Sequence, residues 1–341
     1  MKTIIKTFAY TILCVAAAGC AKTVSTGPNE AGRRYFDAWM EVNHPGVNPT
    51  GLGIYVLEEE EGTGEVVKKD GYVYADYVIT DLEGNISSYT SKETAKQLGA
   101  YDTTAYYGPK VLTTIENTIP AGLADAILGM KAGGRKKVII PGWLMTYLTY
   151  ESKEDYLKYE STGSNTIYDI RIADFTEDID KYQISQIGDY LAENSKVFGG
   201  MTAADSVSYG FYYKQLEAPS SLDSLKKDTT VYINYTGRLL NGLVFDTTIE
   251  KVAKDNGIYS ASRTYEPTQI NWAEEPGKIT MGSSKSSAID GFTNTLWQMR
   301  ADEKGIGVFY SPLGYGYSGK GSSIPAYAPL VFEIELVAKP K

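Results

Sequence analysis

Alternation of apolar and polar residues near the C-terminus predicts an antiparallel hairpin. Residues 231–235 place apolar side chains at every second position, a period that is typical of a strand with one face on a core. Asn241-Gly242 then stands between two apolar runs, which strongly favours a tight turn. The return strand would bring Phe245 and Asp246 back beside Tyr235. A phenylalanine, an aspartate and a tyrosine should therefore lie close together.

Two other stretches have the spacing of amphipathic helices. Residues 33–42 place Phe36 and Trp39 three positions apart, and the sequence Asn-His-Pro-Gly at 43–46 ends the pattern. Residues 178–194 have the same periodicity. The first helix would either pack on its own domain or offer a face to a partner, and because it is short we expect it to pack on its own domain.

The chain also contains an internal repeat, in which residues 53–172 resemble residues 210–336. Both halves have the sequence Lys-Lys-Asp, at 68–70 and at 226–228. From this aspartate a tyrosine and a glycine follow at equal intervals, as Asp70, Tyr77 and Gly84 in the first half and Asp228, Tyr235 and Gly242 in the second. We therefore expect two domains of one fold, joined by the helix at 178–194.

The N-terminus has the features of a secretory signal. Lys2 and Lys6 precede an apolar run that ends in small residues, and this run is too short for a membrane span. Residues 17–20, Ala-Ala-Gly-Cys, are similar to a bacterial lipobox, which implies cleavage before Cys20 and acylation of that residue. An ordinary signal peptide with an incidental cysteine is the alternative. Residues 21–32 are rich in small and polar residues and predict a flexible tether.

Composition argues against several classes of site. The chain has 33 basic and 42 acidic residues, and without residues 1–19 its net charge would be −11, so nucleic acid would be a poor partner. One histidine and two cysteines, Cys14 and Cys20, cannot assemble a zinc-type site. Because both cysteines lie in or beside the signal, we expect no disulfide in the mature chain. Neither a metal nor a cofactor is expected.

Several motifs in the second half resemble the FKBP-type peptidyl-prolyl cis-trans isomerases. The family's V-x-V-x-Y-x-G-x-L strand, its turn and its F-D-S return strand have counterparts within residues 231–247. Further counterparts follow in the family's order at Ala288–Phe292, Gln298-Met299, Ser311–Gly316, Ile324-Pro325 and Leu330–Leu336. The resemblance implies an α+β fold, in which an antiparallel β-sheet wraps around a short α-helix.

The resemblance also implies a pocket that binds a proline ring and catalyses cis-trans isomerisation of the bond before it. The residues implied are Phe245, Ile289, Phe292, Ile324 and Phe332 as apolar lining, Tyr235 and Tyr315 as hydroxyl donors to substrate carbonyls, and Asp246 as a group that orients a tyrosine or polarises the rotating carbonyl's surroundings. Phe292 stands where the family usually has tryptophan. Considered alone, the apolar residues would be buried in any small sheet domain, and Asp246 would serve as a hairpin cap.

The first half lacks most of these residues. Where the second half has Gly237, Phe245-Asp246, Ile289 and Phe292, the first has Ile79, Ser87-Ser88, Pro120 and Leu123. Only Tyr77 is clearly retained, so we expect the first domain to keep the fold and to have lost catalysis. In the second half, residues 249–277 are more than such a domain needs, and this segment is either a flap over the site or a mobile loop.

The expected organisation follows from these observations. It comprises a signal peptide at 1–19, a lipid-anchored tether and short helix at 20–50, a degenerate FKBP-like domain at 51–176, a helical linker at 177–209 and an FKBP-type isomerase domain at 210–341. The expected function is isomerisation of X-Pro bonds in exported polypeptides, by a protein held through Cys20 to a membrane of the bacterial envelope, on the periplasmic face rather than the cell surface. A non-catalytic chaperone or peptide-binding lipoprotein is the main alternative, and a structural component of an envelope assembly is a third.

Overall fold

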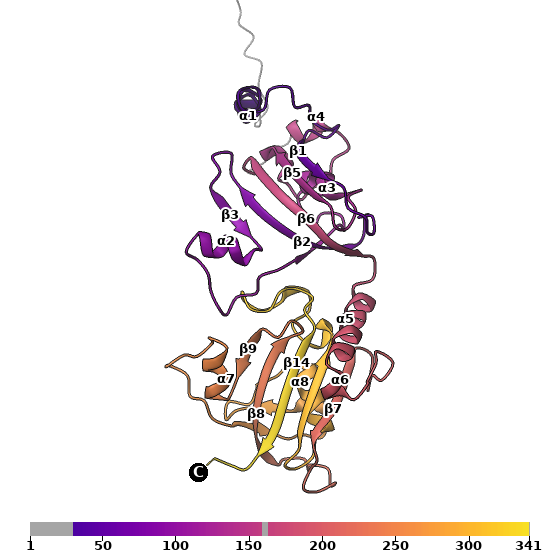
Figure 1. Cartoon of the computed structure of the whole chain (residues 1–341), viewed down its shortest axis with the longest axis vertical. Helices are drawn as coiled ribbons and strands as arrows, with labels where there is room; N and C mark the ends of the chain where they lie inside the picture. Colours follow the sequence, from indigo (N-terminus) through magenta and orange to yellow (C-terminus); the bar gives the residue numbers. More distant parts are fainter. Residues whose placement is uncertain (1–29, 159–162, 341) are drawn as a thin grey trace, which may run out of the picture.

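The computed structural model describes residues 30–158 and 163–340. These residues form two β-sheets that follow one another along the long axis of the molecule, with helix α5 (Ile179–Glu193) leading from the first to the second (Figure 1). All strand pairings within the described residues are antiparallel. The predicted mixed class with antiparallel sheets is confirmed.

The first sheet has the strand order β1-β5-β6-β2-β3, and β4 also pairs with β2. Its strands are β1 (Tyr55–Glu60), β2 (Tyr72–Thr80), β3 (Ile86–Tyr89), β4 (Lys110–Thr113), β5 (Arg135–Ile140) and β6 (Thr166–Thr176). The short helix α3 (Ala121–Ile127) packs on this sheet through buried Leu123, Ala126 and Ile127. Helices α2 (Lys92–Gln97) and α4 (Lys153–Lys158) and the 3-10 turn Gly142–Leu144 occupy its connections.

The second sheet has the order β12-β11-β10-β8-β14-β13-β7, and β9 also pairs with β8. Its strands are β7 (Phe211–Glu217), β8 (Thr230–Leu239), β9 (Val244–Thr247), β10 (Thr268–Asn271), β11 (Thr280–Met281), β12 (Ser286–Ser287), β13 (Lys304–Phe309) and β14 (Leu330–Val337). Helix α8 (Asp290–Gln298) packs on it through Phe292 and Leu296, and begins and ends where the motifs predict. Connections contain α6 (Ser195–Phe198), α7 (Glu250–Asp255) and the 3-10 turns Pro276–Lys278, Ser311–Leu313 and Gly316–Ser318.

Strand for strand, the second sheet repeats the connectivity of the first and adds β11 and β12 at one edge. In this correspondence β1 to β6 match β7, β8, β9, β10, β13 and β14 in turn. Pairing registers agree as well: Ile79 lies opposite Ser88 and Tyr168, and Gly237 lies opposite Asp246 and Phe332. Ile79, Ser88 and Tyr168 of the first sheet are therefore at positions equivalent to Gly237, Asp246 and Phe332 of the second.

Both predicted helices are present. Helix α1 (Glu30–Asn43) buries Phe36 completely, with its ring centroid 5.4 Å from that of Trp143 and 5.6 Å from that of Tyr55. Packing on its own domain is thus confirmed. Helix α5 begins after Asp178, whose carboxylate accepts a hydrogen bond from Lys181 N–H at 3.1 Å as an N-cap. Its apolar face joins a cluster on the second sheet, on the opposite side from α8.

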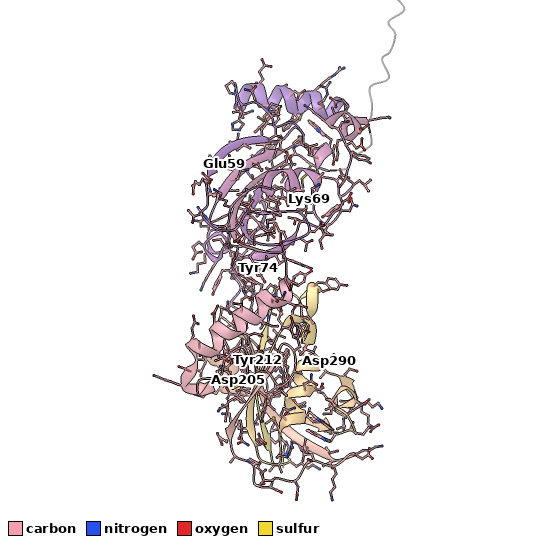
Figure 2. The ribbon with its side chains drawn as sticks, turned by 90° about the vertical axis from the view of Figure 1, so that its right-hand side faces the viewer. Glu59, Lys69, Tyr74, Asp205, Tyr212 and Asp290 are labelled. Atoms are coloured by element: carbon pink, nitrogen blue, oxygen red, sulfur yellow. The ribbon has the colours of Figure 1, made fainter. Side chains whose placement is uncertain are left out.

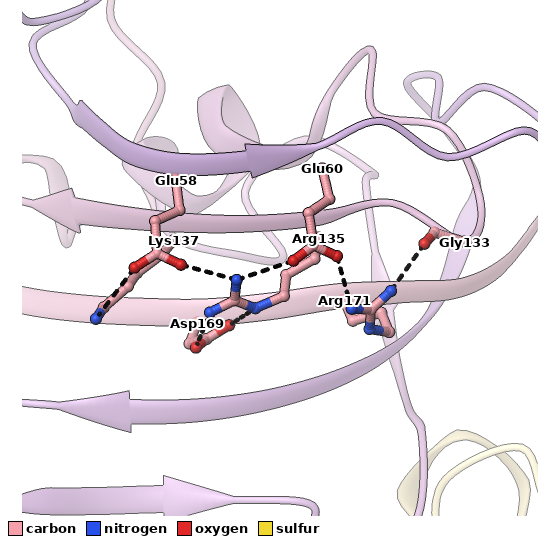
Figure 3. Close-up of polar contacts among 7 residues, drawn as sticks. All are labelled: Glu58, Glu60, Gly133, Arg135, Lys137, Asp169 and Arg171. Carbon is pink, nitrogen blue, oxygen red and sulfur yellow. Dashed lines mark hydrogen bonds and ion pairs between the residues drawn. The ribbon is translucent and has the colours of Figure 1, made fainter.

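The polar face of the first sheet carries a network of ion pairs (Figure 3). The guanidinium of Arg135 donates two hydrogen bonds to Asp169, each 2.7 Å long, and also pairs with Glu58 and Glu60. Arg171 in turn donates to Glu60 at 3.0 Å. The network joins β1, β5 and β6, and its bidentate geometry makes it stronger than isolated surface pairs. Its charges are matched within the sheet, which favours a structural role for this face.

Part of one expectation is wrong, and others fall outside the described residues. The segment 249–277 is not a single loop, because it contains α7 and the four-residue strand β10, which pairs with β8 as β4 pairs with β2. The predicted signal peptide, Cys20 and most of the tether lie outside the described residues. Among residues 30–158 and 163–340, no helix is long and apolar enough to cross a bilayer. In the same ranges no three His, Cys, Asp or Glu side chains are grouped so as to hold a metal ion.

Candidate active site

The hairpin of β8 and β9 delivers the central residues of the site. Asn241 and Gly242 make its turn, with Gly242 at φ +87° and the Asn241 side chain accepting a hydrogen bond from Leu243 N–H at 3.1 Å. A register shift next to Gly237 leaves one extra residue in β9. Consecutive strand residues normally point to opposite faces, and a bulge removes this restriction. Phe245 and Asp246 are thus able to line one cavity.

This cavity has a volume of about 690 Å³, and five of its fifteen lining residues are aromatic. Phe332 on β14 is central, with its ring centroid 5.2 Å from that of Phe292, 5.6 Å from that of Phe245 and 6.2 Å from that of Tyr235. The Phe292 and Phe245 contacts have the edge-to-face geometry that aromatic pairs prefer. Phe292 and Phe332 are only 2% and 5% exposed. These two buried rings pack against each other at the base of the cavity.

Gly237 is the backbone position that makes room for these rings. A Cβ atom at this residue would lie 2.6 Å from Phe245 Cε2 and 2.9 Å from Phe332 Cε1, closer than real side chains approach. The equivalent residue of the first sheet is Ile79, and Tyr168 occupies the place of Phe332. Ile79 is a partly buried side chain packed against the core of the first sheet.

The eight residues that the sequence analysis assigned to the pocket all line this one cavity: Tyr235, Phe245, Asp246, Ile289, Phe292, Tyr315, Ile324 and Phe332. They come from β8, β9, β14, the start of α8 and the long connection between β13 and β14. Lining residues that the sequence analysis missed include Met281, Ser287, Ala288 and Lys320. Ala288 stands in the motif at 288–292, whereas Met281, Ser287 and Lys320 belong to none of the motifs found along the chain.

Asp246 lies within a polar cluster at the rim. Its Oδ2 accepts a hydrogen bond from the Tyr235 hydroxyl at 2.7 Å, and its Oδ1 pairs with Arg263 at 2.5 Å. Arg263 belongs to the segment between α7 and β10, and its guanidinium also lies 5.4 Å from the ring centroid of Tyr265. The turn itself is capped by Asn241, so the hairpin-cap alternative for Asp246 is wrong. No sequence motif pointed to Arg263.

The two tyrosines of the site differ in whether the hydroxyl proton is free to reach a substrate. Burial, and next the neighbouring Asp246, raise the pKa of Tyr235, so its hydroxyl stays protonated and directs that proton to the carboxylate. In this arrangement Tyr235 cannot also donate to a substrate carbonyl, which corrects that part of the expectation. Tyr315 accepts a hydrogen bond from Lys320 at 3.3 Å. Its own proton remains available, since an ammonium group cannot accept it.

The equivalent positions of the first sheet hold different side chains. Ser88 takes the position of Asp246 and Leu123 lies buried in the core under the sheet. Burial raises the pKa of Tyr77, the counterpart of Tyr235, while its contact with Ser88 lowers it to a lesser degree. A serine in place of a carboxylate leaves this position without a negative charge.

Residues 223–337 match the family model of the FKBP-type peptidyl-prolyl cis-trans isomerases. This match covers most of the second sheet, from before β8 to the end of β14. A probable FKBP-type peptidyl-prolyl cis-trans isomerase of Haemophilus influenzae is 29% identical over 128 residues, which are 38% of this chain and 42% of the relative. The chain thus spans less than half of that relative. FK506-binding protein 1A of Aspergillus fumigatus is 29% identical over 125 residues, 36% of this chain and 90% of its own length.

A solved structure of the three FKBP domains of wheat FKBP73 aligns with 84% of this chain and 94% of its own, at 14% identity. The TM-score of 0.29 is too low for a comparison of domain arrangement. The aromatic cavity described above lies wholly within the matched FKBP-type domain, because its lining residues run from Tyr235 to Phe332.

Proposed function

We propose that this protein is a peptidyl-prolyl cis-trans isomerase whose active site is the aromatic cavity of the FKBP-type domain. The observation that carries the proposal is the convergence of the eight named residues on one cavity of about 690 Å³. Ligand sites of this size are typically apolar with a few placed polar groups. The substrates are proline-containing segments of polypeptides.

The chemistry requires neither a nucleophile nor a metal. Rotation about an X-Pro bond is slow because amide resonance sets a barrier of about 18–20 kcal/mol. In the twisted transition state this resonance is lost, and the carbonyl oxygen carries less charge than in the planar amide. A water-poor aromatic cavity therefore stabilises the twisted state relative to the hydrated planar one, and each ~1.4 kcal/mol of this preference accelerates rotation about tenfold.

Individual residues have separate roles in this proposal. Phe332, Phe292 and Ile289 hold the proline ring, while Phe245 closes one side. Tyr315 donates its hydroxyl proton to a substrate carbonyl and so fixes the bound peptide. Tyr235, Asp246 and Arg263 act together as a fixed wall, in which the carboxylate holds both partners in place. The negative charge of Asp246 then lies beside the rotating carbonyl.

The domain boundaries are part of the same proposal. Residues 51–176 are a degenerate copy of the FKBP-like domain, 177–209 a helical linker and 210–341 the isomerase domain. Equal strand order and equal registers in the two sheets support the copy, and Ile79 and Ser88 in place of Gly237 and Asp246 support the loss of catalysis. Residues 1–19 and Cys20 are proposed to direct export and lipid anchoring in the bacterial envelope, on the basis of their sequence alone.

The decisive experiment measures turnover of short X-Pro peptides by the mature chain, beside Asp246→Ala and Tyr235→Phe. We expect both variants to lower kcat/KM by about tenfold or more, since one lost hydrogen bond to a charged group corresponds to roughly 1.5–3 kcal/mol. Asp223→Ala and Tyr317→Phe are matched controls, because both residues are exposed and lie outside the cavity. A wild-type chain no faster than buffer, yet able to suppress aggregation of an unfolded protein, would establish the chaperone alternative instead.

A further inference from the structure

The first domain contacts the loop between β13 and β14, which forms one wall of the aromatic cavity. This cavity is called the proline cavity below, because proline is proposed to bind there. Tyr106 N–H donates a hydrogen bond to the carbonyl of Ser322 at 2.8 Å. The ring centroids of Tyr72 and Tyr327 lie 5.4 Å apart, and the Thr103 hydroxyl donates to the carbonyl of Gly257 at 2.9 Å. In Figure 1 the connection between β13 and β14 reaches up from the second sheet to the connection between α2 and β4 of the first. The two domains therefore meet at the site itself.

A second cavity of about 520 Å³ lies at this junction. The first domain contributes four tyrosines to its lining, Tyr77, Tyr89, Tyr106 and Tyr107, and the second contributes Ile324 and Pro325. Asp102 and Lys110 also line it, and because their charges are opposite they favour neither an anion nor a cation. The chemistry of the lining is that of flat aromatic rings with polar edges.

The junction cavity lies directly beside the aromatic cavity of the second domain, in which the proline is proposed to bind. Gly321, Ser322 and Ile324 line both of them, so the wall that separates the two is a single segment of chain. An extended polypeptide advances by at most about 3.3–3.6 Å per residue. A chain whose proline occupies the first cavity therefore needs only a few further residues to reach the second.

We propose that the junction cavity binds an aromatic or large apolar side chain of the same polypeptide whose proline occupies the proline cavity. This proposal rests on the proposed function and gives the first domain a direct part in substrate recognition. Aromatic side chains suit a tyrosine-lined site because edge-to-face and offset contacts add to the burial of apolar surface. A tyrosine hydroxyl can also hydrogen-bond the peptide backbone.

Tyr89 is the best residue for a test. It is half-buried and lines the junction cavity from the edge strand β3, and it does not line the proline cavity. Tyr106, by contrast, is unsuitable because its side chain also packs against the apolar core of the second sheet. Tyr35 provides a matched control, since it is 56% exposed on α1, at the far end of the first domain in Figure 1.

The experiment uses the mature chain and a series of twelve-residue, alanine-rich peptides that contain one proline and one phenylalanine at varied distance on either side of it. Isomerisation gives kcat and KM, and fluorescence anisotropy of labelled peptides gives the dissociation constant. At one favoured spacing we expect phenylalanine to lower KM and the dissociation constant by about tenfold relative to alanine, the order expected for partial burial of one aromatic ring. Tyr89→Ala should abolish this gain, whereas Tyr35→Ala should preserve it.

The outcomes separate this inference from the proposed function. If short X-Pro tetrapeptides are turned over equally by wild type and Tyr89→Ala, but no spacing of phenylalanine improves KM, the junction site is wrong and the isomerase remains. The same holds if a gain at one spacing survives Tyr89→Ala. If tetrapeptides are not turned over at all, anisotropy still decides: binding that depends on both phenylalanine and Tyr89 sustains the junction site without the enzyme.

Discussion

Gly237→Ala tests whether the geometry of the aromatic cavity determines activity. The added Cβ would lie 2.6 Å and 2.8 Å from two atoms of the Phe245 ring, and 2.9 Å from Phe332. To restore an ordinary contact of 3.4 Å, the Phe245 ring must move by about 0.8 Å. The ring lines the cavity, so this movement alters the space that receives proline.

Overpacking of this kind typically costs about 1–3 kcal/mol of unfolding free energy. A displacement near 1 Å at a reacting group lowers rates by up to about a hundredfold. For Gly237→Ala we therefore expect a folded protein with a lower midpoint in urea and a kcat/KM for X-Pro tetrapeptides reduced by about ten- to a hundredfold. Stability and activity are measured on the same preparation, by circular dichroism and by peptide turnover.

Gly277→Ala is the matched control. A Cβ at Gly277 meets nothing within 4 Å, and its φ is not in the left-handed region. Replacement of glycine at such a position usually stabilises by about 0.4–1 kcal/mol through the unfolded chain. If Gly237→Ala matches wild type in both kcat/KM and urea midpoint, the close approach of backbone and rings does not constrain the site, and the argument from Gly237 is refuted.

Two further predictions concern stability at high pH and the N-terminus. Burial raises the pKa of Tyr74 and of Tyr235 above the usual 10.0, so the stability that this shift contributes is complete below pH 10 and is lost above it. The unfolding free energy should then fall by up to ~1.4 kcal/mol per pH unit for each tyrosine. In urea unfolding between pH 8 and 11, Tyr235→Phe should show a smaller decrease in this free energy than wild type. Equal decreases would contradict the assignment of this pH dependence to Tyr235. Figure 2 shows Tyr74 at the end of the first sheet that faces the second domain, where its ring centroid lies 4.8 Å from that of Tyr182 on α5. For the N-terminus, Cys20→Ser should move the protein from the membrane fraction to the soluble fraction; wild type that is already soluble, with the mass of an unmodified chain, would disprove lipid anchoring.

Local patterns in the sequence predict the hairpin of β8 and β9 and the bounds of α5 and α8 well. Period-two alternation, an Asn-Gly turn and helical spacing depend on neighbours along the chain, so they can be recognised without tertiary structure. The repeat and the resemblance to the family then bring Tyr235, Asp246 and Phe332 to one pocket, and all eight predicted lining residues are found there. The sequence by itself therefore determined the second sheet's central hairpin and eight of the fifteen residues that line its cavity.

Only the tertiary structure decided what surrounds that cavity. Arg263 contacts Asp246 from the segment between α7 and β10, and Lys320 contacts Tyr315 within the β13–β14 connection. No pattern in the sequence predicts either contact. The partnership of Tyr235 with Asp246 and the junction with the first domain likewise depend on how separate elements pack. Periodicity reports which face of an element is buried, but it carries no information on which distant side chain lies opposite, because that is set by packing between elements far apart in the chain.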